Sequence, residues 1–331
     1  MENKNPLNTE ETTEMEVSAE ETSPTSTLSS GVMQERDIKE VSKKQAVMKV
    51  LVQIGLYAFL GIMALIVLFP FYWMIISSLK TTTEYNDPIP TLFPKNPFFD
   101  NYEQAFTVSL SKSSDVTLVT LFGNTLFVGV VSTLLSLVIT VLSAFAFARL
   151  EFKGKGVLFA ALLATMMIPG ELFTITNYET VVRDFQWGET FTALIVPFLV
   201  SIFYIYLLKQ NFQQIPNELY LAAKVDGTTD FKYLLRVMIP LALPTIISIT
   251  LLKMMGAWNT YMWPNLVADV PELYLITNGL RKMSIIDPVT QEQNIPVQMA
   301  AVTIVSTPLF LVFIFLRKYI MKGVSRSGIK G

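Results

Sequence analysis

Residues 217–240 read NELYLAAKVDGTTDFKYLLRVMIP, and this polar, charged stretch lies between two long apolar runs of the chain. Pro216 stands just before it, and proline is favoured in the first turn of a helix, where its missing N–H costs no hydrogen bond. Glu218 follows at the positive end of the expected helix dipole. Gly227 can adopt the left-handed conformation that ends a helix. The stretch therefore predicts a short helix followed by a tight turn.

A second helix is expected directly after that turn. Thr228 or Thr229 can cap its N-terminus, and the helix then continues into the next apolar run at Pro240. The first helix carries small apolar residues at helical spacing, and these are Leu219, Ala222 and Ala223. Because two alanines allow another molecule to approach closely, we expect this element to dock against a partner.

The composition indicates a membrane protein. Of 331 residues 51% are hydrophobic and only 16% are charged, whereas soluble domains carry about 25% charged residues. The chain has no cysteine, so it has no thiolate metal ligand. It also has no histidine, which is the commonest metal ligand and the commonest general base. We expect neither a metal site nor catalytic residues.

The charged residues divide the chain into a tail and a membrane domain. Residues 1–45 are rich in Ser, Thr and Glu, and such a segment buries too little apolar surface to fold, so we expect an acidic, disordered tail. Residues 46–331 form the expected transmembrane domain. Since about 20 apolar residues span a bilayer, its apolar runs predict six helices, at about 51–77, 121–148, 156–178, 190–208, 237–263 and 293–316.

Lysine and arginine placement predicts the orientation. The segments after spans two, four and six are basic, and the segments after spans one, three and five are acidic or mixed. Both termini and residues 217–240 are therefore expected in the cytoplasm, in a multi-pass protein of the plasma membrane.

Several stretches in the same order resemble one family. AAKVDG at 222–227, preceded by IPNEL, resembles the Glu-Ala-Ala loop of ABC importer permeases, and in particular the second permease of maltose-type, binding-protein-dependent sugar systems. The resemblance covers roughly residues 45 to 331. It is carried further by SSLKTTTEY, NTLFVG, SAFAFARLEFKGKG, MMIPGE, GAWNTYMWP and KGVSRSGIKG.

The resemblance implies an all-α fold of six transmembrane helices, that of type I ABC importer permeases, with a cytoplasmic coupling helix. It implies that Ala222, Ala223, Asp226 and Gly227 form the coupling element and insert into a groove of a separate ATPase subunit. The implied partners are a homologous second permease, two ATPase subunits, an extracytoplasmic solute-binding protein and the lipid bilayer, with no nucleic acid. The family's acidic residue before the paired alanines is replaced here by Leu221.

The chain itself carries no ATPase motif. A phosphate-binding loop needs Gly-x4-Gly-Lys-Ser/Thr, and the nearest candidate, Gly154-Lys155-Gly156, lacks its second glycine and hydroxyl. We therefore expect no cofactor on this chain and no enzymatic activity, with ATP and Mg²⁺ bound by the partner ATPase.

Polar and amphipathic residues within the spans are candidates for the substrate pathway, because such residues are costly in a membrane and because aromatic faces with amide or hydroxyl donors match sugars. Trp263 fits an interfacial aromatic belt equally well, and Glu171 can lie among lipid headgroups. Lys253 can reach outward to the interface, pair with an acid of the second permease, or contact substrate. The full candidate set is Asn124, Lys253, Trp258, Asn259 and Tyr261.

The expected function is ATP-driven import of a carbohydrate, and among carbohydrates an oligosaccharide, across the plasma membrane. Import of a glycerol phosphoester or polyol is the alternative substrate class. A self-sufficient channel or ion-coupled transporter is the alternative of a different class, and in it the loop at 217–240 would be only structural.

Overall fold

The computed structural model describes residues 25–107, 115–282, 285 and 293–325, with side chains described outside 25–47 and 316–325. Contacts between residues divide the chain into two units, Met1–Phe69 and Pro70–Gly331. The first unit contains most of helix α1, Thr25–Ser78, and the apolar part of this helix, Met48–Ser78, is long enough to span a membrane.

The helix α1 begins well before the predicted first span. We predicted no regular structure for residues 1–45, but residues 25–45 are helical. The physical reason is that no proline interrupts 25–69, so the helix of the apolar run can continue into the polar segment. Residues 1–24 lie outside the described part of the chain.

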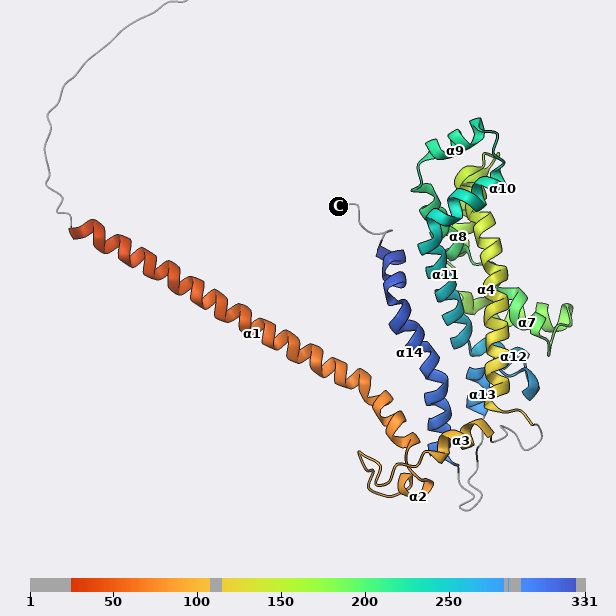
Figure 1. The fold of residues 1–331 in the computed structure, drawn as a ribbon, viewed down its shortest axis with the longest axis horizontal. Helices are drawn as coiled ribbons and strands as arrows, with labels where there is room; N and C mark the ends of the chain where they lie inside the picture. The colour runs from red at the N-terminus through yellow and green to blue at the C-terminus, as the bar shows by residue number, and fades with distance from the viewer. Residues whose placement is uncertain (1–24, 108–114, 283–284, 286–292, 326–331) are drawn as a thin grey trace, which may run out of the picture. The chain divides into compact units, whose positions relative to one another are not determined.

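The second unit is helical in its described residues (Figure 1). Its long helices are α4 (Leu118–Arg149), α11 (Ile239–Asn259) and α14 (Ile295–Ser325). Medium-length helices are α3 (Asp100–Thr107), α5 (Lys155–Thr165), α8 (Ile202–Gln213), α9 (Asn217–Val225) and α13 (Ile276–Lys282). Short turns of helix complete it: α2 (Thr82–Tyr85), η1 (Gly170–Phe173), α6 (Thr174–Tyr178), η2 (Glu179–Asp184), α7 (Phe191–Ile195), η3 (Val196–Phe198), α10 (Asp230–Tyr233), η4 (Leu234–Met238), α12 (Met262–Val267) and η5 (Pro271–Leu273).

Four helical segments are long and apolar enough to cross a membrane, and the number rises to six if each of two bent pairs is one span. The straight segments are Met48–Ser78, Leu118–Arg149, Asp230–Asn259 and Ile295–Phe315. Spans one, two and six were thus predicted to within a few residues.

The third and fourth spans are bent, whereas we predicted single helices. Lys155–Thr165 and Gly170–Asp184 meet at 85°, and Phe191–Phe198 and Ile202–Gln213 meet at 45°. Pro169 stands at the first break, and Pro197 stands beside the second. Proline removes one helical N–H and clashes with the preceding turn, which accounts for both bends.

The fifth span is displaced from its predicted bounds of 237–263. It begins at Asp230, because α10 continues through the π-helical turn η4 into α11. It ends at Asn259, because Thr260 is extended, with ψ 130°. Trp263 consequently lies in a separate helix, α12.

Helix α4 connects the two ends of the second unit. Figure 1 shows α9 and α10 beyond one end of α4, and α3 and α13 beside the other. Three apolar clusters of buried residues pack along α4. One lies around α3, α13 and α14, one around α8, α10 and α11, and one around α7 and α12. Helices α9 and α13 thus lie near opposite ends of α4, which is long enough to span a membrane.

Candidate functional site

The first candidate site is the turn between α9 and α10. Gly227 has φ +71°, the left-handed conformation that the sequence predicted. Its N–H donates to the Lys224 carbonyl at 3.0 Å, and the Thr228 N–H donates to the Ala223 carbonyl at 2.8 Å. These two bonds form a Schellman motif, which ends α9 at a fixed angle. A Cβ built at Gly227 would have no atom within 4 Å, so glycine is required here by its φ angle and not by lack of space.

The N-cap of the second helix is Thr229, one of the two residues predicted for this role. The Thr229 side chain accepts a hydrogen bond from the Lys232 N–H at 3.4 Å and is the N-cap of α10. Only Gly227 and Thr228 lie between the C-cap of α9, Asp226, and the N-cap of α10, Thr229. The change of direction from α9 to α10 is therefore determined by the backbone.

Side chains tie α9 to α10 a second time. Asp230 Oδ1 lies 2.6 Å from Lys224 Nζ and accepts a hydrogen bond of 2.7 Å from the Tyr220 hydroxyl. The hydrogen bond with Asp230 raises the pKa of Lys224 above its ordinary value of 10.5. Burial, and next to it the bond with Asp230, raises the pKa of Tyr220. Both groups therefore keep their protons, and the link persists, throughout the neutral range.

The outer face of α9 is apolar and exposed. Leu221 is 55% exposed and Val225 is 88% exposed, and these two residues are one helical turn apart. Ala222, next to them, is exposed as well, whereas Ala223 packs partly buried against the cluster around α8, α10 and α11. The predicted face of Leu219, Ala222 and Ala223 is thus divided: Ala222 faces outward with Leu221, and Ala223 faces the protein.

Arg149 anchors the chain that enters α9. It is the last residue of α4, it is buried, and its Nη2 donates to the carbonyls of Phe212 and Ile215 at 2.9 and 2.5 Å. These carbonyls belong to the last turn of α8 and the connection to α9. Helix ends leave such carbonyls without intrahelical donors, so one guanidinium completes the end of α8 and fixes the start of α9.

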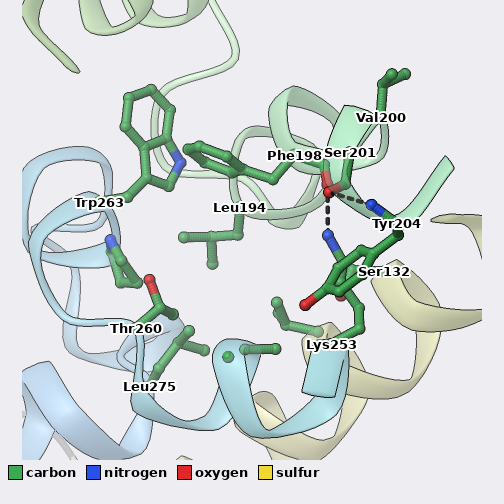
Figure 2. Close-up of a pocket in the computed structure, with 14 residues that line it drawn as sticks. Ser132, Leu194, Phe198, Val200, Ser201, Tyr204, Lys253, Thr260, Trp263 and Leu275 are labelled. Carbon is green, nitrogen blue, oxygen red and sulfur yellow. Dashed lines mark hydrogen bonds between the residues drawn. The ribbon is translucent and has the colours of Figure 1, made fainter. Parts of the chain in front are cut away.

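The second candidate site is a cavity of about 360 Å³. It lies where α4, α11 and α12 meet the break between η3 and α8, and its lining is aromatic, hydroxylic and apolar (Figure 2). The aromatic rings are those of Phe198, Tyr204 and Trp263, and the polar groups are Ser132, Ser201, Lys253 and Thr260. This volume lies in the range of small-molecule sites.

Of the predicted pathway residues only Lys253 lines this cavity. Its Nζ donates to the Phe198 carbonyl at 2.6 Å (Figure 2), which is a carbonyl released by the bend. Lys253 is therefore directed at the break between η3 and α8. Irregular backbone inside a membrane needs such partners.

The other four candidates lie elsewhere. Asn124 donates to the carbonyls of Glu272 and Tyr274, at 2.7 and 3.0 Å, and so holds the connection between α12 and α13 to α4. Trp258 is buried against Phe122. Asn259 donates to the Met255 carbonyl of its own helix at 2.8 Å, and the Tyr261 ring lies 5.1 Å from the guanidinium carbon of Arg281.

The sequence pattern did not predict Ser132, Phe198, Ser201 or Tyr204. The signal for this group was Pro197 followed four residues later by Ser201, a proline break followed by a helix cap within one apolar run. It also missed the link through Tyr220 and Asp230, whose spacing of ten residues is not helical. Trp263, considered as a belt residue, is buried and donates to the Ala193 carbonyl at 2.9 Å.

Comparison with known proteins gives one family match over most of the chain. Residues 57–326 match the family described as binding-protein-dependent transport system inner membrane component. The arabinooligosaccharides transport system permease protein of Halalkalibacterium halodurans is 28% identical over 291 residues, which is 87% of this chain and 99% of the relative. The sn-glycerol-3-phosphate transport system permease protein of Brucella abortus is 28% identical over 78% of this chain and 91% of the relative.

The fold is also found in a solved structure. It is the crystal structure of a bacterial ABC transporter involved in the import of the acidic polysaccharide alginate. The match has a TM-score of 0.72 at 24% identity and covers 81% of this chain and 96% of the other. The fold is therefore the all-helical fold of an ABC importer permease.

Proposed function

This chain belongs to the family of binding-protein-dependent transport system inner membrane components, and we propose that it imports a carbohydrate, in the first instance an oligosaccharide. As a family member it is the transmembrane permease of an ABC importer and a multi-pass protein of the plasma membrane. It is not the ATPase, and permeases of this family carry no cofactor. A binding-protein-dependent ABC system supplies an ATPase and a solute-binding protein as partners. Membership of this family argues against the alternative function, a self-sufficient channel or ion-coupled transporter.

The assembly we propose contains a homologous second permease and two ATPase subunits, with both termini of this chain in the cytoplasm. The basic segments that follow spans two, four and six support this orientation, since lysine and arginine are retained on the cytoplasmic side. In this orientation α9 faces the ATPase and α13 faces the binding protein.

The observation that carries the proposal is the rigid path from α9 into the fifth span. The Schellman turn and the Lys224–Asp230 pair hold α9 to α10. From α10 the helix continues through η4 into α11. When ATP draws the ATPases together, a displacement of α9 is carried along this path to the cavity beside Lys253. The coupling residues are Ala222, Ala223, Asp226 and Gly227.

A carbohydrate suits the cavity chemically. Sugars present apolar C–H faces and a polar rim, which aromatic rings and hydroxyl groups can contact. The cavity has aromatic rings next to hydroxyl groups. The likeness to an arabinooligosaccharides permease supports the same class. Likeness at 28% identity to sn-glycerol-3-phosphate permeases supports a glycerol phosphoester as the second candidate.

The test is purification of the intact complex from native membranes in mild detergent, followed by reconstitution into liposomes. We expect this chain, a second permease and an ATPase at about 1:1:2, and uptake of an oligosaccharide that needs ATP and the binding protein. Recovery of this chain alone, with uptake independent of ATP, would contradict the proposal.

A further inference from the structure

The cavity at the break of the fourth span carries positive charge from Lys253. In the described part of the chain no Asp or Glu lines this cavity, and no ion pair involves Lys253. A lysine ammonium has three N–H donors, and the Phe198 carbonyl accepts one of them. A carbonyl oxygen is a partial charge, so the full charge of the ammonium remains without a counter-ion.

A second positive feature points to the same place. Helix α8 has 12 residues and starts at the cavity, with Ser201 as its N-cap and Val200, Ser201 and Tyr204 in the lining (Figure 2). The first N–H groups of a helix have no intrahelical acceptor, and the helix dipole is positive at this end. Broken membrane helices commonly direct such an end at an anionic group.

Lys253 lies within its helix and not at its end. It lies six residues before the end of α11 at Asn259, which is about 9 Å along a helix that rises 1.5 Å per residue. A lysine at this depth is costly unless a partner compensates its charge. The break alone does not require a cation, because a serine or threonine hydroxyl can also satisfy a released carbonyl.

We propose that this cavity binds an anionic group of the transported solute, a carboxylate or a phosphate, with Lys253 as its counter-ion. The solute is thus an acidic sugar or a phosphorylated polyol, held by the ammonium, the start of α8 and the hydroxyl of Thr260. The aromatic rings of the lining face its apolar carbon skeleton. This inference rests on the proposed function and names the charge of its substrate.

The experiment measures ATP-dependent uptake into liposomes by the complete complex with its binding protein. The probes are two matched pairs, digalacturonate with galactobiose and glycerol 3-phosphate with glycerol. The variants are Lys253→Gln, which removes the charge, and Lys253→Arg, which keeps it. Lys95→Gln is the control, since Lys95 is exposed and paired with Asp87 on the connection between the first and second spans.

We expect uptake of one anionic probe, and its identity distinguishes carboxylate from phosphate. Lys253→Gln should lower that uptake about tenfold to a hundredfold, the loss of one hydrogen bond to a charged group. Lys253→Arg should retain most of it, and Lys95→Gln all of it. Thermal unfolding of each purified complex separates loss of binding from loss of folding.

Three results would overturn the inference while leaving the proposed function intact. One is ATP-dependent uptake restricted to the neutral probes, and another is anion uptake unchanged in Lys253→Gln. The third is a zero-length carbodiimide cross-link between Lys253 and a carboxylate of the second permease, which would identify that carboxylate as the counter-ion. Failure of the proposed function would be seen instead as ATP-independent uptake by this chain alone.

Discussion

Gly227 determines the angle between α9 and α10 through its φ of +71° alone, since a side chain there would meet no atom. A β-branched residue should adopt this angle at a cost of more than about 1 to 2 kcal/mol. We therefore expect Gly227→Val to lower ATP-dependent uptake about 5- to 30-fold, while the membrane spans still fold.

Gly227→Asn is the matched control, because asparagine tolerates the left-handed region. It should retain most of the uptake in the same liposome assay. Equal loss in both variants would contradict a role for the φ angle and would indicate contact of the ATPase with the glycine itself.

Leu221 is the residue at which this chain departs from the pattern that the resemblance implied. It is 55% exposed next to Ala222, and burying a leucine at an interface contributes about 1.5 to 3 kcal/mol. We expect Leu221→Glu to weaken association with the native ATPase, because it buries a carboxylate at a site adapted to an apolar group.

Leu221→Met should leave the association unchanged, since it keeps volume and polarity. The measurement is the amount of ATPase retained on the immobilised permease as detergent washing is prolonged. Tighter retention of the ATPase by Leu221→Glu would show that the groove still prefers the acid.

Residues whose roles depend on their sequence neighbours were predicted correctly. Residues whose roles depend on partners distant in sequence were not. The terminator Gly227 was predicted, and the cap Thr229 was one of two predicted, because their effects depend on neighbouring residues only. Asn124 and Trp258 were predicted as pathway residues because polar and amphipathic groups are costly in spans and because aromatic faces match sugars. Their partners, the Glu272 carbonyl and Phe122, are set by packing that periodicity does not encode.

Among the elements, α4, α8 and α9 are joined by one buried side chain. Arg149 supplies hydrogen bonds to the carbonyls of Phe212 and Ile215. Each hydrogen bond to a charged group contributes about 1.5 to 3 kcal/mol. Arg149→Ala should therefore lower the thermal stability of the purified protein strongly and reduce uptake with it.

The control for this variant is Arg183→Ala. Arg183 is also paired, with Glu179 at 2.7 Å, but its side chain is 70% exposed, and exposed pairs contribute little. Its unfolding temperature should stay close to that of the native protein. A similar small effect for Arg149→Ala would contradict the anchoring role of this arginine.

Element boundaries were predicted well where apolar runs are uninterrupted. The runs of α1, α4 and α14 gave their spans within a few residues. The bends at Pro169 and Pro197 were not predicted, although both prolines were visible, because a proline permits either a kink or a full break. In the fourth span Lys253 stabilises the break from another helix, which no local pattern reveals.

For the whole molecule, six spans require both termini on one side of the membrane. The chain contains no cysteine, so single cysteines report topology without background. Ser18→Cys and Ser327→Cys should resist a membrane-impermeant maleimide in intact cells and react after permeabilisation.

Ile89→Cys serves as the external reference, because Ile89 is 81% exposed on the connection after the first span. It should react in intact cells. Reaction of both terminal cysteines in intact cells would invert the proposed orientation and place α9 outside, and reaction of only one of them would contradict the six-span arrangement.

The central claim is that the outer face of α9 docks on the ATPase, and site-specific photo-cross-linking in native membranes tests it most directly. A photoreactive phenylalanine analogue at Val225, 88% exposed on α9, is compared with one at Ile89. The account predicts that Val225 cross-links to a protein with an ATP-binding loop, identified by mass spectrometry, and that Ile89 does not. Co-purification of that ATPase with no cross-link from Val225, together with a cross-link from another cytoplasmic segment, would contradict it.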